Sequence, residues 1–330
     1  MRSVILAVGC FACGDDGNGT SIDAAPDGTQ TTCETTAPWA NAPALPLGPT
    51  QETAVVAAGG KIYVFGGFTQ ATGIVAAVQV FDPASCTWSM GPALPKPVHH
   101  ANAAVVDGTI YVLGSLETIN FTALPDVWSW NPATETAWST KAPMPAGTQR
   151  GSAVAGVIDG KIYLAGGFRG GAVGDVTMYD PAANAWTTGL PAMPMSRDHG
   201  CGGVVGGKLY VLGGRQGNIN TQSPITYEFT PGVGWAERAP MPTARGGTAC
   251  GVIGNRIAVV GGEGNSAIAS GVFPQAELYD ASANTWATLT PMPFPRHGMG
   301  AAVVNGRMYI PGGADRQGFG AVATHDILTP

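Results

Sequence analysis

Charged side chains are scarce in this chain. Lys, Arg, Asp and Glu make up 12% of its 330 residues, about half the share of an average soluble protein, and the net charge is −6 with no basic run. Nucleic-acid binding needs clustered Lys and Arg to displace counterions, so we expect no nucleic-acid partner. Beyond the N-terminal segment, no apolar stretch is long enough to span a membrane. The chain also lacks any helical period, whereas Gly (49) and Pro (26) are abundant, which favours short strands and many turns.

Two sequence markers recur with one period. A Gly pair follows an apolar run, as in KIYVFGG, and it or its equivalent stands at Gly66-Gly67, Gly114-Ser115, Gly166-Gly167, Gly213-Gly214, Gly261-Gly262 and Gly312-Gly313. A Trp series runs in step at Trp39, Trp88, Trp138, Trp186, Trp235 and Trp286. Both markers are spaced by 47–52 residues. Two independent markers therefore indicate six units of about 50 residues.

Each unit repeats the same order of segments. A small apolar run leads to a hairpin dipeptide such as Asp107-Gly108, which suits a turn that needs positive φ. An IYV run follows, then a variable loop, a strand ending in Tyr-Asp-Pro or a variant, and the Trp strand. The IYV run is apolar on successive residues, so it is covered on both faces. Six sheets of four antiparallel strands, packed face to face around an axis, predict an all-β, six-bladed β-propeller.

The units resemble kelch repeats: Arg or His near the start, the GK-I-Y-V-x-GG core, Y-D-P, then Trp. The resemblance covers about Trp39 to Pro330 and implies a kelch-type propeller over residues 38–330. The last unit stops before its Trp strand, whereas Trp39 has no strands before it. We therefore expect the N-terminal strand to complete the last blade and close the ring.

The N-terminus resembles that of a bacterial lipoprotein. Residues 1–12, MRSVILAVGCFA, read as a signal peptide, and Cys13 begins a polar segment that we interpret as a disordered tether over residues 13–37. This resemblance implies lipidation of Cys13, a location in the bacterial cell envelope, and membrane contact only through a lipid anchor. Cys10 is the alternative processed cysteine, because Leu is missing from its usual place before Cys13. The other interpretation is a disordered N-terminus on a cytoplasmic protein.

Four further cysteines remain: Cys33, Cys86, Cys201 and Cys250. An even number in an exported protein suggests disulfides. Cys201 and Cys250 lie in the first strands of adjacent units, and Cys33 and Cys86 each lie shortly before a Trp. Four buried free thiols are the alternative.

One repeat position is rich in arginine. Counting back eleven residues from the start of the IYV strand gives Thr50, Val98, Arg150, Arg197, Arg245 and Arg296, which we call the arginine position. In peptide-binding kelch domains this position presents guanidinium groups to an acidic ligand, so the resemblance makes these four Arg candidate ligand residues. The alternative is that they only bond carbonyl groups of a neighbouring blade. The loops after the Gly pairs add Arg215 and Glu263 as candidates.

Histidines cluster at the starts of units. His100, His199 and His297 all precede a first strand, in alternate units. A metal site from these three is conceivable, but residues on alternate blades suggest solvated rim positions too far apart to share an ion. We therefore expect no metal and no cofactor, and we place His100, His199 and His297 among the ligand-binding candidates.

Catalysis is the second hypothesis. The kelch family includes copper-radical oxidases, but all eight Tyr fall at strand positions of the repeat. The carboxylates left over near the rim are Glu52, Asp198, Glu263 and Asp315, among which a general acid–base pair is possible. Six-bladed kelch mutarotases of sialic acid give this alternative a concrete form.

The sequence thus predicts a monomeric, exported, lipid-anchored propeller. We expect it to bind a protein, an acidic peptide or an anionic glycan through one end of its axis. A carbohydrate-active enzyme is the alternative, and the catalytic residues are then unknown.

Overall fold

The computed structural model describes residues 33, 37–70 and 73–330. The predicted signal peptide, Cys13 and most of the predicted tether therefore lie outside the described residues. Within the described part, the regular elements are all strands. The described residues therefore contain no helix that could cross a membrane. Residues 32–330 form one compact unit.

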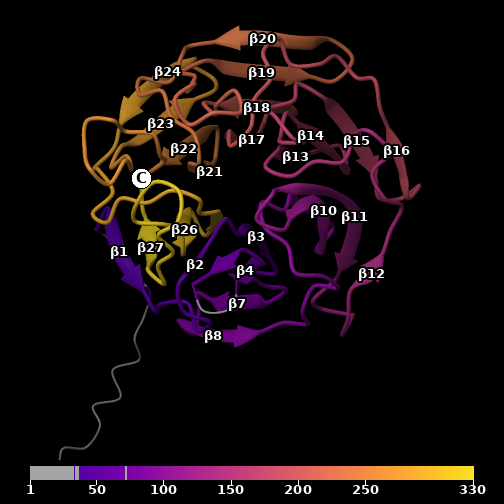
Figure 1. The fold of residues 1–330 in the computed structure, drawn as a ribbon, viewed down its shortest axis with the longest axis horizontal. Coiled ribbons are helices and arrows are strands. Elements are labelled where there is room, and N and C mark those ends of the chain that lie inside the picture. The colour runs from indigo at the N-terminus through magenta and orange to yellow at the C-terminus, as the bar shows by residue number, and fades with distance from the viewer. Residues whose placement is uncertain (1–32, 34–36, 71–72) are drawn as a thin grey trace, which may run out of the picture. The chain divides into compact units, whose positions relative to one another are not determined.

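Six four-stranded antiparallel sheets follow one another around a ring (Figure 1). Blade 1 holds β3 (Ala54–Ala58), β4 (Lys61–Phe65), β7 (Val78–Asp82) and β8 (Thr87–Met90). Blade 2 holds β9 (Ala103–Val106), β10 (Thr109–Glu117), β11 (Thr122–Trp130) and β12 (Ser139–Thr140). Blade 3 holds β13 (Val154–Ile158), β14 (Lys161–Ala165), β15 (Val176–Asp180) and β16 (Ala185–Thr187).

The second half of the ring continues the pattern. Blade 4 holds β17 (Cys201–Val205), β18 (Lys208–Leu212), β19 (Thr226–Thr230) and β20 (Gly234–Arg238). Blade 5 holds β21 (Ala249–Ile253), β22 (Arg256–Val260), β23 (Ala276–Asp280) and β24 (Thr285–Thr288). Blade 6 holds β25 (Ala302–Val304), β26 (Arg307–Pro311), β27 (His325–Leu328) and β1 (Trp39–Ala42). A small extra sheet, β2 (Thr50–Gln51), β5 (Phe68–Thr69) and β6 (Gly73–Ile74), lies in the loops of blade 1.

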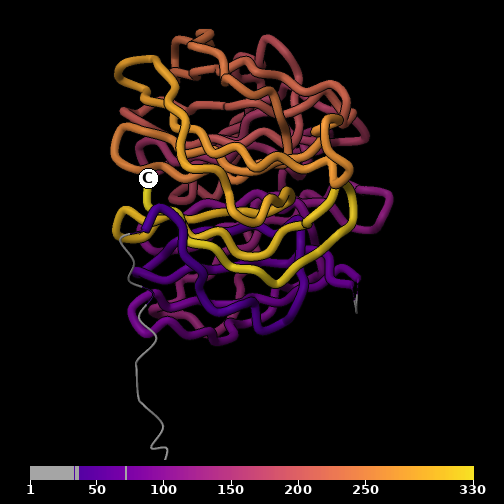
Figure 2. The backbone as a smooth tube through the Cα atoms, turned by 90° about the vertical axis from the view of Figure 1, so that its left-hand side faces the viewer, coloured from indigo at the N-terminus to yellow at the C-terminus, as the bar shows by residue number. Residues whose placement is uncertain are grey.

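The prediction that the two ends close the ring is confirmed. Strand β1 pairs antiparallel with β27, with Trp39 opposite Leu328 and Ala42 opposite His325. The indigo and yellow segments lie side by side in both views (Figures 1 and 2). Because β1 supplies the outer strand of blade 6, the edge of β27 is paired rather than open.

The apolar core is divided among the six blade interfaces. In the IYV run, Ile62 is buried in the cluster shared with blade 6, whereas Tyr63 is buried in the cluster shared with blade 2. The same alternation gives one apolar cluster for each pair of neighbouring blades. This is why the run is apolar on successive residues.

The Trp series joins neighbouring blades at the outer edge. Each indole Nε1–H donates to a carbonyl in the link that leaves the preceding blade. These bonds are Trp39 to Thr290, Trp88 to Pro43, Trp138 to Pro92, Trp186 to Ala142, Trp235 to Pro191 and Trp286 to Ala239. The spacing of the Trp marker therefore follows from an inter-blade hydrogen bond.

The Gly pair has a matching role near the axis. In blade 5 the first glycine, Gly261, has φ of 65°, and a Cβ there would lie 2.3 Å from the carbonyl oxygen of Arg296 in blade 6. The second glycine, Gly262, donates its N–H to that same oxygen at 2.8 Å. Gly313 donates to Thr50 in the same way, which repeats the contact across the closure of the ring. No side chain fits between neighbouring blades at this point.

The four arginines do not form the expected basic surface. Each is 0–1% exposed. Each donates to the carbonyl of the first glycine of its own blade's Gly pair: Arg150 to Gly166, Arg197 to Gly213, Arg245 to Gly261 and Arg296 to Gly312. Two of them also pair with a buried carboxylate, Arg245 with Glu277 and Arg296 with Asp326. Because their N–H groups are used inside the blade, they brace the fold rather than face a ligand.

Both pairs of cysteines are disulfide-bonded in the structure. Cys33 joins Cys86 with their Cα atoms 5.5 Å apart, and Cys201 joins Cys250 at 5.6 Å. The second disulfide links the first strands of blades 4 and 5. The first ties the segment before β1 to blade 1.

Removing β1 is expected to destabilise the propeller. A chain starting at residue 48 loses the outer strand of blade 6 and should melt roughly 10 °C or more below the full chain. A chain starting at residue 32 keeps β1, so its melting temperature in calorimetry should equal that of the full chain. Because the shorter chain also loses Cys33, the double variant Cys33→Ser with Cys86→Ser in the full chain is the control for the disulfide. Equal melting of both truncations would show that β1 does not hold the ring.

Arg245→Ala is expected to cost about 3–5 kcal/mol of unfolding free energy, since it leaves Glu277 buried and uncompensated. Arg256→Ala is the matched control, because Arg256 is exposed at the start of β22. Urea unfolding of both variants measures the difference. If Arg245→Ala and Arg256→Ala have the same free energy of unfolding, Arg245 does not brace the blade.

Candidate functional site

The site begins with a repeat position two residues after the arginine position. We call it the axial position, and it is held by Glu52, His100, Ser152, His199, Gly247 and Gly298. All six residues have positive φ, between 50° and 68°. Only two of them are glycine, so four side chains are held in a backbone conformation that non-glycine residues rarely adopt. Such strain concentrates at functional sites.

Hydrogen bonds join the axial positions into a closed ring. Each backbone N–H donates to the axial residue of the preceding blade: Glu52 to Gly298, His100 to Glu52, Ser152 to His100, Gly247 to His199 and Gly298 to Gly247. His199 N–H donates to the hydroxyl of Ser152 at 3.2 Å, which completes the circle. The left-handed conformation is what allows each backbone to bridge to its neighbour while its side chain lies by the axis.

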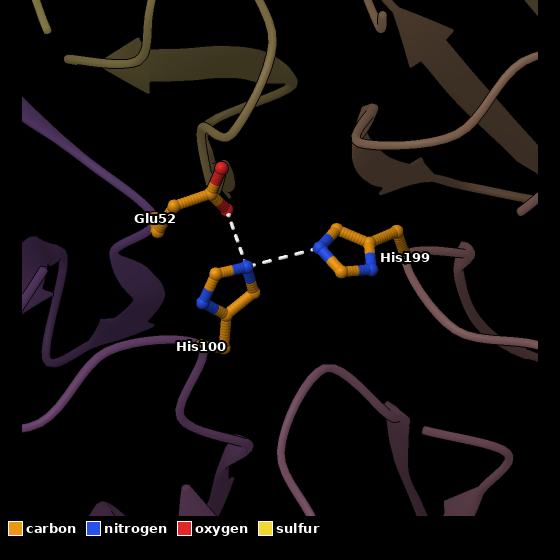
Figure 3. A group of neighbouring side chains, drawn as sticks. All are labelled: Glu52, His100 and His199. Atoms are coloured by element: carbon orange, nitrogen blue, oxygen red, sulfur yellow. Dashed lines mark hydrogen bonds and ion pairs between the residues drawn. The ribbon is translucent and has the colours of Figure 1, made fainter. Parts of the chain in front are cut away.

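Three axial side chains meet at the centre (Figure 3). His100 Nε2 lies 3.0 Å from Glu52 Oε2 and 3.0 Å from His199 Nε2. The two imidazole side chains are 4% and 5% exposed. The prediction that the histidines are solvated and too far apart to share an ion is therefore wrong. Symmetry brings alternate blades together at the axis, where the ring is narrowest.

Neighbouring residues contact the Nδ1 atoms of both imidazoles. His99 Nδ1 lies 2.6 Å from His100 Nδ1, and its Nε2 lies 3.0 Å from the carbonyl oxygen of Thr118. Asp198 Oδ1 lies 2.5 Å from His199 Nδ1. Each imidazole is thus fixed through Nδ1, with Nε2 directed to the centre.

Arg215 and Glu263 extend this network. The Arg215 guanidinium donates to Asp198 at 3.0 Å, to Glu263 at 2.5 Å and to His199 Nε2 at 3.0 Å. Arg215 and Glu263 both stand immediately after a Gly pair, and each bridges to the residue that follows the arginine position in its own blade. The repeat therefore aims both side chains at the axis.

His297 adds a third imidazole from blade 6. It is 1% exposed, and its Nε2 donates to the carbonyl of Arg316 at 2.8 Å. Its Nδ1 has no hydrogen-bond partner among the described residues, although Glu263 Oε2 lies 3.4 Å away and Glu52 Oε1 3.7 Å away. A buried nitrogen beside two carboxylates is placed to exchange a proton or to meet a ligand.

The cluster changes the pKa values of its members. Burial raises the pKa of the Glu52 carboxyl, but His100, His297 and His199 outweigh it and hold that pKa well below its usual range. Burial lowers the pKa of His199, and the charge of Arg215 lowers it further. Burial also lowers the pKa of His99 to about 4. At neutral pH the Glu52 carboxyl is therefore ionised and His99 is neutral.

A pocket of about 220 Å³ lies over this cluster. Its lining includes the polar side chains of Glu52, His100, His199, Glu263 and His297. Phenylalanine rings from three blades line it as well, namely Phe68, Phe121 and Phe319. Phe68 meets Phe319 edge to face, with ring centroids 5.4 Å apart. On the other side of the axial ring, small side chains of the first strands line a channel of about 200 Å³.

The structure sorts the predicted site residues into two groups. It brings together Glu52, His100, His199, Arg215, Glu263 and His297 around one pocket. It places Arg150, Arg197, Arg245 and Arg296 inside the blades. The pocket residues that the sequence did not single out include Phe121, Gln317 and Phe319, which come from variable loops. Comparing the residues two places after the arginine position across the units would have found the axial ring.

The comparisons with known proteins agree with this architecture. A family model described as the KLHDC2/KLHL20/DRC7 Kelch-repeats domain matches residues 29–214. Kelch-like protein terF of Aspergillus terreus is 37% identical over 313 residues, which is 88% of this chain and 66% of that protein. Human Kelch-like protein 23 is 26% identical over 259 residues, which is 76% of this chain and 43% of that protein. The chain thus spans less than two thirds of the length of these relatives.

The solved structure titled "Structure of YjhT" has the same fold. It matches with a TM-score of 0.72 over 86% of this chain and 95% of that chain, at 18% identity. Together with the repeated Gly pairs, their arginine braces and the Trp hydrogen bonds, the family match shows that this chain belongs to the kelch-repeat family.

Proposed function

We propose that this propeller binds a small, oxygen-rich molecule of the sugar or hydroxy-acid class in the pocket at the axis, and acts on it by proton transfer. The observation that carries the proposal is the pair of carboxylates, Glu52 and Glu263, whose oxygens lie 3.7 and 3.4 Å from the buried Nδ1 of His297. A pocket with few, convergent polar groups is typical of a small-molecule site. Its size admits one or two sugar rings rather than a folded partner.

The lining suits a molecule with two kinds of surface. The rings of Phe68, Phe121 and Phe319 offer apolar faces on which the C–H side of a sugar can stack. The same lining offers carboxylate and imidazole groups that accept hydrogen bonds from hydroxyl groups. His297 Nδ1 is the atom that takes up the proton of a ligand hydroxyl, and Glu263 stabilises the imidazolium that forms. This chemistry favours the carbohydrate-active enzyme over the peptide-binding module.

A protein or peptide partner is the second candidate. The arginines that suggested an acidic peptide are buried, so that basis is lost. Exposed apolar side chains remain in three loops at the pocket end of the axis: Ile119 at 76%, Ile268 at 44% and Phe319 at 65% exposed. These residues favour contact with a partner that covers the mouth of the pocket.

Phe319→Ala is expected to weaken small-ligand binding about tenfold, because it removes one stacking ring without opening the core. Phe294→Ala is the matched control, since Phe294 is also exposed, at 43%, but does not line the pocket. The measurement is calorimetric titration with neutral sugars, uronic acids and hydroxy acids. His297→Asn should retain binding and slow the exchange of sugar anomers followed by NMR. Binding of peptides alone, or equal losses in both Phe variants, would overturn the proposal.

We also propose that the chain is exported and anchored through lipid on Cys13. The two disulfides support export, because disulfides persist in oxidising compartments. In a bacterial host, Cys13→Ser should move the protein from the membrane fraction to the soluble fraction, and the wild type should lose residues 1–12. The matched control is Cys10→Ser, which tests the alternative processing site. An intact mass showing unmodified Cys13 on exported protein would contradict the anchor.

A further inference from the structure

The two imidazoles at the axis direct their Nε2 atoms toward one another, 3.0 Å apart. A carbonyl oxygen only accepts, so the 3.0 Å contact with Thr118 places a hydrogen on His99 Nε2. That tautomer leaves His99 Nδ1 as an acceptor, so His100 Nδ1 donates in the 2.6 Å contact. The other ring nitrogen of His100, Nε2, faces Glu52 Oε2 and His199 Nε2, each at 3.0 Å.

The same reasoning applies to His199 from the other side of the ring. Asp198 Oδ1 accepts from His199 Nδ1, which places the hydrogen there. Arg215 can only donate, so its 3.0 Å contact with His199 Nε2 identifies that nitrogen as an acceptor. His199 Nε2 therefore carries a lone pair, and it lies 3.0 Å from His100 Nε2.

Two imidazole nitrogens and one carboxylate oxygen thus converge at the axis. The donor atoms of Glu52, His100 and His199 all lie within 4.8 Å of one another. We propose that these three residues bind a divalent first-row transition metal ion at the axis of the propeller. Two imidazoles and one carboxylate form a donor set that such ions prefer, with positions left open for a ligand from the pocket.

The outer contacts fit this assignment. Metal-binding histidines donate their other N–H to a carboxylate or a neighbouring acceptor, which fixes the tautomer. Asp198 plays that part for His199, and His99, itself held by Thr118, plays it for His100.

The carboxylates around the cluster also favour a cation. The side chains of Glu52, Asp198 and Glu263 are 12%, 1% and 4% exposed, so water screens them poorly. An ion replaces the contact of Arg215 with His199 Nε2, whereas Arg215 keeps its pairs with Asp198 and Glu263.

The site stands on these side chains alone and does not need the proposed small-molecule ligand. If a ligand does enter the pocket, the metal supplies a Lewis acid for its oxygen atoms. His297 and Glu263 remain outside the donor set and stay free to handle a proton.

The test is titration of the chelator-treated full chain with Zn²⁺ by calorimetry, and with Co²⁺ by visible absorption. We expect one site with a Kd of about 1 µM or below. Glu52→Gln and His199→Asn should each weaken it by about 100-fold or more, and Asp198→Asn by about 10- to 100-fold. Glu237→Gln, in an exposed residue of β20, is the matched control and should leave it unchanged.

If a variant fails to fold, the wild-type protein alone still tests whether the axial site binds a metal ion. One bound Co²⁺ should give d–d absorption bands of nitrogen and oxygen ligation and raise the melting temperature. Absence of saturable binding below 1 mM, or undiminished binding by folded Glu52→Gln and His199→Asn, would overturn the proposal. The titrations contain no sugar or acid, so their failure leaves the small-molecule proposal to its own experiment.

Discussion

The closed circle of hydrogen bonds between axial residues is the constraint on which the rest of this structure depends. Each blade must place one backbone N–H and one acceptor at the same height on the axis, so each adopts positive φ at the same residue. Immediately outside the circle, the Gly pair of one blade meets the carbonyl at the arginine position of the next. Farther out, the Trp indoles bond the outer links. The length of one repeat is the length of chain needed to reach all three contacts in turn.

The same constraint concentrates chemistry at the axis. A backbone held from both sides does not relax, so Glu52, His100 and His199 keep a conformation that would be unstable in a free loop. Six equivalent positions face one another across a narrow channel, and side chains from alternate blades come within hydrogen-bond distance. A scaffold that repeats its backbone can therefore vary its side chains independently at each blade.

The arginines show how a repeated residue differs from a functional one. Arg150, Arg197, Arg245 and Arg296 recur because in blades 3 to 6 each donates to the same carbonyl, that of the first glycine in the Gly pair of its blade. The residues of the pocket do not recur: Arg215 and Glu263 occupy a position that holds Phe68 in blade 1 and Ala314 in blade 6. In this chain, regular positions serve the fold and irregular ones form the site.

The sequence by itself determined the elements, their number and the closure of the ring, because these depend on local periodicity: the Gly pair, the hairpin dipeptides and the Trp series each act within one unit or on its neighbour. It also named most of the charged residues of the pocket, since Glu52, His100, His199, Arg215, Glu263 and His297 depart from the repeat. Only the tertiary structure decided that these residues meet and that the arginines are buried. Glu52, His100 and His199 come from blades 1, 2 and 4 and are separated by up to about 150 residues of chain. No local sequence pattern encodes the 3.0 Å distance between His100 and His199. That distance is set by the radius of the axial ring, which follows from the packing of all six blades together.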